Sequence, residues 1–245
     1  MTSLFIHLFF IGFTFLQSWT IPADAHVRVD EIGNVYVISS DAIQLLPGGN
    51  SPAAIYSEAS FGAIQSLDLR DPLKPMVFFK GSGKMVFLDN TMSVQGQVID
   101  LFDAPVNQPL LACSSVDHHV WVFDGINQEL IRISPTFRVT ARTGNLMQLI
   151  GAAVEPLVLM ERDNRIYLVD DKKRVLEFDL FATFLGKRLV PGVVDIDVRK
   201  ETVYALTNTN EVFTWNRTLV LPRLVDLPPH EELRSINILR DRVFL

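Results

Sequence analysis

Residues 64–101 read IQSLDLRDPLKPMVFFKGSGKMVFLDNTMSVQGQVIDL. Four short apolar runs stand out in this stretch, and polar or glycine-containing segments separate them: 64–69, 76–79, 85–88 and 97–101. Runs of about four to six residues that are rich in Val, Ile and Phe and bounded by turn residues are typical of β-strands. The stretch therefore predicts four consecutive strands joined by turns.

The same unit recurs along the chain, and its second run carries an aromatic residue: VWVF at 120–123, IYLV at 166–169 and VYAL at 203–206. Equivalent positions of successive units are 47, 46, 39 and 40 residues apart: Ile64, Leu111, Leu157, Ile196 and Ile236. Repeats of about 40–50 residues with four strands each are typical of β-propeller blades. We therefore expect an all-β propeller in which radial stacking gives every blade an apolar partner on each side.

The number of blades is less regular. Five units have four predicted strands, and the first of them spans about residues 27–60. The outermost strands of the fourth and fifth units are weak, at 181–185 and 218–221, and single helical turns are predicted at 144–150 and 229–233. The sixth unit shows only 233–238 and 242–245. We expect a six-bladed propeller with an incomplete last blade: a shortened gene product, a ring completed by a partner strand, or one miscounted hairpin.

A family resemblance lies in residues 27–37, VRVDEIGNVYV. This segment resembles the opening of an NHL repeat, in which a V-x-V-D strand turns through Gly-Asn into V-Y-V. Gly33 and Asn34 can take the positive φ of a tight hairpin, whereas later blades have Asp163-Asn164 or Lys200-Glu201 there. The layout of 27–245 resembles uncharacterised exported six-bladed propellers of Bacteroidetes-type bacteria. The resemblance implies the fold and an exported location, and it brings no catalytic residues.

Residues 1–25 are predicted to be a signal peptide, and residues 26–245 the propeller domain. The apolar run 4–16 is too short for a bilayer core of about 30 Å, and Ala23-Asp24-Ala25 follows it with a small-x-small pattern. We place cleavage after Ala25 and expect a periplasmic or secreted protein with no membrane span after cleavage. No Lys or Arg precedes Arg28, so an uncleaved N-terminal anchor stays the alternative.

Charge and cysteine content limit the possible functions. The net charge of −6 gives no general attraction to nucleic acid or anionic lipid. With Cys113 as the single cysteine, an intramolecular disulfide is impossible. Its apolar strand predicts a small buried side chain rather than a nucleophile paired with His118 or His119.

Few residues have the pattern of a catalytic or metal site. Asp117-His118-His119 is predicted to be a turn between two strands, because adjacent strand residues point to opposite faces. The side chains of Asp68, Asp195 and Asp197 are expected to line a central channel, either as its polar lining or around a cation. Gly81 to Lys84 is a predicted hairpin turn and not a phosphate loop. Trp121 and Trp215 are predicted to lie in the core.

The residues therefore assign no catalytic, cofactor-binding or metal-binding site. The favoured interpretation is a non-enzymatic exported β-propeller, a protein-binding or scaffold module of the cell envelope whose partner is an envelope protein. One alternative is a lactonase-like, metal-dependent hydrolase that holds a cation in the channel through Asp68, Asp195 and Asp197. The other is a degenerate, truncated propeller.

Overall fold

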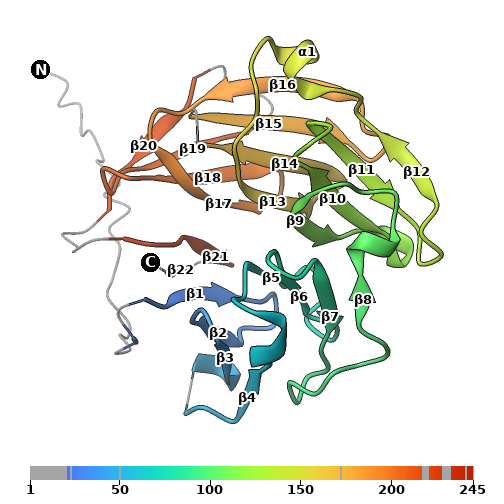
Figure 1. The fold of residues 1–245 in the computed structure, drawn as a ribbon. Helices are drawn as coiled ribbons and strands as arrows, with labels where there is room; N and C mark the ends of the chain where they lie inside the picture. The colour runs from blue at the N-terminus through green and yellow to red at the C-terminus, as the bar shows by residue number, and fades with distance from the viewer. Residues whose placement is uncertain are drawn as a thin grey trace, which may run out of the picture.

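A computed structural model describes residues 21–22, 24–49, 51–171, 173–216, 221–227, 233–240 and 242–244. Five four-stranded antiparallel sheets follow one another along the chain, which confirms the predicted all-β propeller (Figure 1). Blade 1 contains β1 (His26–Val29), β2 (Val35–Ile38), β3 (Ala42–Leu46) and β4 (Ala54–Ser57). Blade 2 contains β5 (Ser66–Asp68), β6 (Met76–Phe79), β7 (Lys84–Phe87) and β8 (Ile99–Asp100).

The next three blades repeat this order. Blade 3 contains β9 (Pro109–Ser114), β10 (Val120–Asp124), β11 (Glu129–Ile133) and β12 (Val139–Arg142). Blade 4 contains β13 (Pro156–Arg162), β14 (Arg165–Asp170), β15 (Arg174–Asp179) and β16 (Phe184–Leu189). Blade 5 contains β17 (Val193–Arg199), β18 (Thr202–Thr207), β19 (Val212–Trp215) and β20 (Arg223–Val225).

The sixth sheet is a hairpin of β21 (Asn237–Leu239) and β22 (Arg242–Phe244) in the described part of the chain. β21 contacts both β17 of blade 5 and β1 of blade 1. The hairpin therefore occupies the place of a sixth blade with its two inner strands, as the sequence predicted. Through it, the last blade meets the first and the ring closes.

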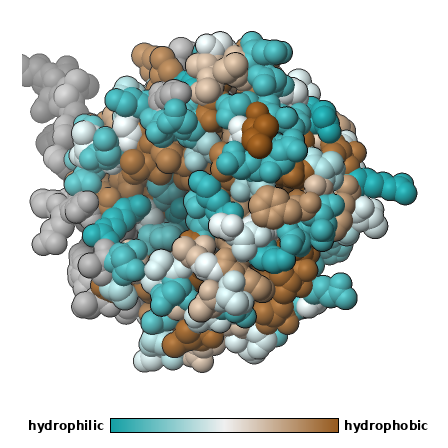
Figure 2. Space-filling view, viewed as in Figure 1, coloured by the Kyte–Doolittle hydropathy of each residue, from teal (hydrophilic) through white to brown (hydrophobic). Residues whose placement is uncertain are grey.

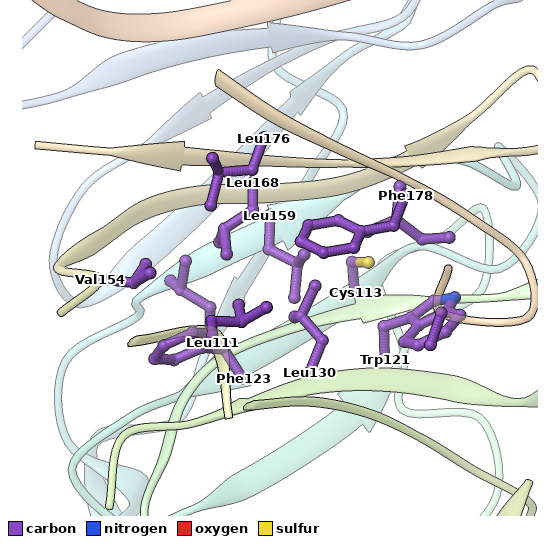
Figure 3. Close-up of a cluster of buried hydrophobic side chains, with 13 residues drawn as sticks. Leu111, Cys113, Trp121, Phe123, Leu130, Val154, Leu159, Leu168, Leu176 and Phe178 are labelled. Atoms are coloured by element: carbon purple, nitrogen blue, oxygen red, sulfur yellow. The ribbon is translucent and has the colours of Figure 1, made fainter. Parts of the chain in front are cut away.

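Among the residues that the structure describes, six clusters of buried apolar side chains hold the ring together, one at each contact between successive blades. Figure 3 shows the cluster between blades 3 and 4, where Trp121, Phe123 and Leu130 of one sheet face Leu168, Leu176 and Phe178 of the other. The cluster between blades 6 and 1 joins Leu239 and Phe244 to Val35 and Val37. Every blade is thus covered on both faces, which is the packing that the repeat predicted.

The middle strands show why the sequence folds this way. All four residues of β6 are buried, and their side chains alternate between the two faces of the sheet. Val77 and Phe79 enter the cluster with blade 1, whereas Met76 and Phe78 enter the cluster with blade 3. A strand with both faces buried reads as a continuous apolar run, which is the pattern that marked each blade in the sequence.

The peripheral elements differ from the predicted bounds. In blade 4 the outermost strand was expected at 181–185 and lies at 184–189, and β8 keeps only two of the five residues predicted for it. The predicted turn at 144–150 is the helix α1 (Leu146–Ile150), capped by the Asn145 side chain. No helix in the described ranges is both long and apolar enough to cross a bilayer. Parts of three predicted segments lie outside the described residues. They are 1–20 and Ala23 of the signal peptide, 218–220 of the strand predicted at 218–221, and 229–232 of the turn predicted at 229–233.

The turn between the first and second strands of blade 1 differs from the corresponding turns of blades 4 and 5. In blade 1, Gly33 has φ +99° as expected, but Asn34 has no positive φ, and the loop is built on Asp30. The Asp30 carboxylate accepts hydrogen bonds from the backbone N–H of Ile32, Gly33 and Asn34. In blades 4 and 5 the turns are two residues long, and all four of their residues have positive φ: Asp163, Asn164, Lys200 and Glu201.

Lys200 is an exposed non-glycine residue at φ +48°, a region that Asn tolerates better than Lys. Lys200→Asn should therefore raise the free energy of unfolding by about 0.5 kcal/mol, and Lys200→Val should lower it by about 1 kcal/mol because β-branched residues avoid this region. Urea denaturation of the purified variants measures both changes. Equal midpoints for the two variants would contradict the expectation.

Candidate functional site

The centre of the ring is lined by the first strands of the blades, and these strands are the inner edges of their sheets. An edge strand leaves backbone N–H groups without a partner inside its own sheet. At the contact between blades 5 and 6, carboxylates fill this role: Asp195 accepts from the N–H of Ile236 at 2.9 Å, and Asp197 accepts from the N–H of Ile238 at 2.6 Å. Acidic side chains of β17 thus stabilise the next blade.

The ring closes through an amide in the same way. Asn237 on β21 is 4 % exposed, and its side chain accepts from the N–H of Val29 at 3.2 Å and donates to the carbonyl of Val27 at 3.0 Å. Because the Asn237 amide has both a donor and an acceptor, it satisfies two groups on the edge of β1 at once.

Two further carboxylates hold blade 3 to its neighbours. Asp68 at the end of β5 accepts from the backbone N–H of Ser114 at 2.7 Å and from its hydroxyl at 2.5 Å. Glu161 on β13 accepts from the Ser115 hydroxyl at 2.5 Å and from the indole N–H of Trp121 at 2.9 Å. Both carboxylates are less than one-tenth exposed.

Arginines balance these charges. Arg28 of blade 1 binds Asp195 with two hydrogen bonds of 2.6 and 2.8 Å, across the position of blade 6. Arg162 lies 3.5 Å from Asp68, and its Nε is buried without a hydrogen-bond partner. The side chain of Arg199 pairs with Asp197 at 3.3 Å and with Glu31 at 3.2 Å. Planar guanidinium groups suit such paired, partly buried contacts.

These side chains surround a cavity of about 100 Å³ in the channel. Its polar lining includes His26, Arg28, Asp68, Arg162, Asp197 and Arg199, and apolar side chains of the first strands complete it. Figure 2, in the orientation of Figure 1, shows many hydrophilic residues around the middle of the ring. The volume is small beside the roughly 300–1,000 Å³ of pockets that hold drug-sized ligands, so the cavity suits water or a very small ligand.

The electrostatics of the channel reflect burial. Burial, followed by the charge of Arg28, lowers the pKa of His26 to about 4, although Asp195 acts in the opposite direction. Burial likewise raises the pKa of Asp197, against the effects of Arg199 and of the N–H of Ile238. The channel therefore disfavours charged forms that lack a partner.

The predicted channel residues are brought together only in part. Asp68 and Asp197 line the cavity, and Asp195 lies beside it in its pair with Arg28. Each of the three carboxylates bonds to an N–H group or guanidinium of a neighbouring blade. Within the described ranges, no three His, Cys, Asp or Glu residues are grouped so that they could hold a metal ion.

The other singled-out residues lie elsewhere. Cys113 is buried in the cluster between blades 3 and 4, where burial, followed by the carboxylates of Asp68 and Glu161, raises the pKa of its thiol well above the usual value (Figure 3). Asp117, His118 and His119 form the predicted turn between β9 and β10, and His118 is exposed. The side chains of Trp121 and Trp215 are buried, as expected.

Sequence reasoning missed the arginines and Asn237. A signal was present for the arginines, because the first strands end in an acidic residue followed one or two positions later by Arg: Asp68 and Arg70, Glu161 and Arg162, Asp197 and Arg199. The sequence did not single out Asn237, because one amide residue beside an apolar strand is common and does not indicate a contact with another blade.

Loss of the Asn237 amide should open the contact between blades 6 and 1. We expect Asn237→Ala to lower the free energy of unfolding by about 2–3 kcal/mol, because two buried backbone groups of β1 lose their partner. Chemical denaturation measures the loss, and Asn90→Ala at an exposed turn is the control. A loss no larger than that of the control would show that this contact does not hold the ring.

The low pKa of His26 predicts a pH dependence. The unfolded chain binds a proton at His26 near pH 6.5 and the folded chain only near pH 4, so folding stability should fall as the pH drops from about 6.5 to 4. Denaturation of a chain that retains residues 21–25 measures the slope, which His26→Asn should reduce. A replacement of the exposed His118 by Asn controls for the loss of a histidine. Equal slopes for the wild type and His26→Asn would contradict the expectation.

Comparisons with known proteins support the fold. No protein-family model matches the chain, and a search of curated proteins finds no match. Among solved structures, the chain is similar to virginiamycin B lyase from Staphylococcus aureus, with a TM-score of 0.58 and 11 % identity over 86 % of this chain and 72 % of the lyase. It is similar to a protein of unknown function from Bacteroides caccae, with a TM-score of 0.61 and 9 % identity over 84 % of each chain.

BBS1N, solved in complex with ARL6DN, is a third similar structure, with a TM-score of 0.57 and 10 % identity over 88 % of this chain and 70 % of BBS1N. At these identities the likeness shows the fold alone. The NHL-like assignment of residues 27–37 stays a prediction. What the comparisons and the strand order establish together is that the chain is a β-propeller.

Proposed function

We propose that the chain is a non-enzymatic exported β-propeller that acts as a protein-binding or scaffold module of the cell envelope. One observation carries this proposal: the acidic side chains of the channel are engaged in holding blades together. Asp68, Glu161 and Asp197 each bond to a backbone N–H of an adjacent blade. Because these carboxylates are hydrogen-bonded within the ring, we infer that a partner contacts the two outer faces of the ring rather than the channel.

One ring face has exposed apolar side chains in its turns. The turns between first and second strands lie together on it, since Asp163 accepts from the N–H of Glu201 and Arg199 pairs with Glu31. On this face, hereafter the first-turn face, Ile32 is 64 % exposed and Leu73 is 66 % exposed. Apolar side chains among charged ones fit a protein interface better than a nucleic-acid or lipid surface.

A protein partner also accords with one of the structural relatives. BBS1N, a similar structure, was crystallised in complex with another protein, ARL6DN. This supports the proposal by analogy of fold, and the partner of the present chain is inferred to be an envelope protein because of the predicted signal peptide.

Export is the second element of the proposal. Ala25 is buried in the cluster between blades 6 and 1, and the half-buried Ile21 packs against the same cluster. Cleavage after Ala25 would remove both side chains from this cluster and leave His26 as the first residue. The mass of the chain recovered from an envelope fraction therefore shows whether it begins at His26.

The binding test uses that recovered chain as bait for an envelope extract of the source cells. We expect it to retain a reproducible protein, and the double variant Ile32→Asp, Leu73→Asp to lose at least about tenfold of the retained amount, because charges at the centre of an interface are strongly unfavourable. Ile126→Asp is the matched control, since Ile126 is 65 % exposed in a turn at the other end of its blade. Equal retention by all three chains, or by none, would overturn the proposed first-turn face.

Elemental analysis of the same preparation tests the enzymatic alternative. One divalent metal ion per chain, lost in Asp68→Asn, would contradict the non-enzymatic proposal and favour a metal-dependent hydrolase. Metal below stoichiometry in both chains is the expected result.

A further inference from the structure

A second cavity, of about 290 Å³, lies between the outer parts of blades 4 and 5, away from the channel. Blade 4 lines it with side chains of β14, β15 and β16, and blade 5 lines it with residues of β18 and β19 and the adjoining turns. Its volume is near the lower end of the roughly 300–1,000 Å³ found for small-molecule sites. None of the channel residues described above contributes to it.

Gly186 keeps this cavity open. It lies on β16 opposite Glu177, in the row of side chains that faces blade 5. A Cβ added to Gly186 would meet no atom within 4 Å, and its backbone is not in the left-handed region. Any side chain here would therefore project into the cavity without strain in the strand.

Trp215 supplies a polar group with no partner. The residue lines the cavity and is 1 % exposed, and its indole N–H is buried without a hydrogen-bond acceptor. A buried donor without an acceptor is costly, and such groups in native proteins are usually satisfied by water or by a ligand. Trp121, in contrast, donates its indole N–H to Glu161.

A cation lies beside the Trp215 indole. The guanidinium of Arg188 lies 5.4 Å from the centre of the Trp215 ring, within the range of a cation–π contact. Arg165 pairs with Glu177 at 3.3 Å. Glu201 is a second carboxylate of the lining, whereas Lys187 pairs across the strands with Leu176 and so points to the opposite face of the sheet. The charged side chains that face the cavity therefore balance, and Arg188 is the cation beside the Trp215 ring.

We propose that this cavity binds the carboxylate group of a small organic acid, with the Trp215 indole N–H and the Arg188 guanidinium as its donors. A guanidinium matches the planar carboxylate, and the indole N–H adds a donor that needs an acceptor. Tyr167, Val203 and the Trp215 ring give the apolar contacts for a short carbon chain. The site does not depend on the proposed protein-binding role: Ile32 and Leu73 belong to blades 1 and 2, and of the first-turn face only Glu201 in the turn of blade 5 reaches the cavity.

Calorimetric titration of the purified chain with succinate, in a buffer without carboxylates or phosphate, tests this proposal. We expect saturable binding at one site per chain. Trp215→Phe keeps an aromatic side chain but removes the N–H donor, and should weaken binding about fivefold or more, whereas Gly186→Val should abolish binding by filling the cavity. Gly81→Val is the matched control, because Gly81 also has open space around an added Cβ but lies in a turn of blade 2.

Thermal unfolding of each variant shows that it is folded, and inorganic phosphate is titrated in parallel. If succinate shows no saturable binding, or if Trp215→Phe and Gly186→Val bind it like the wild type, the site does not exist as proposed. If phosphate binds as tightly as succinate and is equally sensitive to both variants, the site takes anions in general and the carboxylate assignment is wrong. Arg188→Met gives an independent check and should weaken succinate binding about tenfold, because the charge-assisted contact is lost.

Discussion

The fold depends on one constraint: a four-stranded blade with apolar side chains on both faces is stable only between two neighbours. Val77 and Met76 are adjacent in β6, yet they enter different clusters on opposite sides of blade 2. A linear array of such blades would leave an apolar face exposed at each end, so the array must close on itself. The hairpin β21–β22 meets this requirement because Ile238 packs toward blade 5 while Leu239 packs toward blade 1. Two strands are enough to cover both end faces near the channel.

Closure also requires chemistry at the inner edges, where apolar packing cannot satisfy backbone N–H groups. The chain uses carboxylates and one amide for this purpose, and arginines lie beside several of the buried carboxylates. Arg28 and Asp195 show the arrangement well, since they join blades 1 and 5 and the Asp195 carboxylate also holds the backbone of blade 6. Removing one member of such a set leaves the others buried without partners, so its residues are expected to change together rather than singly.

The sequence was sufficient for the strands that are buried on both faces. Val120 to Phe123 and Ile166 to Val169 were recognisable because burial on two sides produces an unbroken apolar run. The outermost strands were harder to place, since β16 alternates between half-buried and exposed residues and its hydrogen-bonded partner on β15 decides where it begins. The site was harder still. The repeat placed Asp68 on a first strand and therefore in the channel. Its contact with Ser114 depends on how blades 2 and 3 are shifted relative to each other along the channel axis, and no local sequence pattern specifies that shift. The same holds for the rim cavity, where Gly186 and Trp215 come from different blades.

The closing contact has a consequence for the order in which the protein folds. The bond from Val29 to Asn237 joins residues 208 positions apart, whereas contacts between blades that follow one another along the chain are far more local, such as the 46 positions between Asp68 and Ser114. Blades 2 to 5 can assemble one after another as synthesis proceeds, but blade 1 keeps Val35, Val37 and Leu46 uncovered until the last hairpin has emerged. Contacts of such long sequence separation form slowly, and an uncovered apolar sheet is prone to aggregation meanwhile. Blade 1 is therefore the part of the newly made chain that has the greatest need of a chaperone.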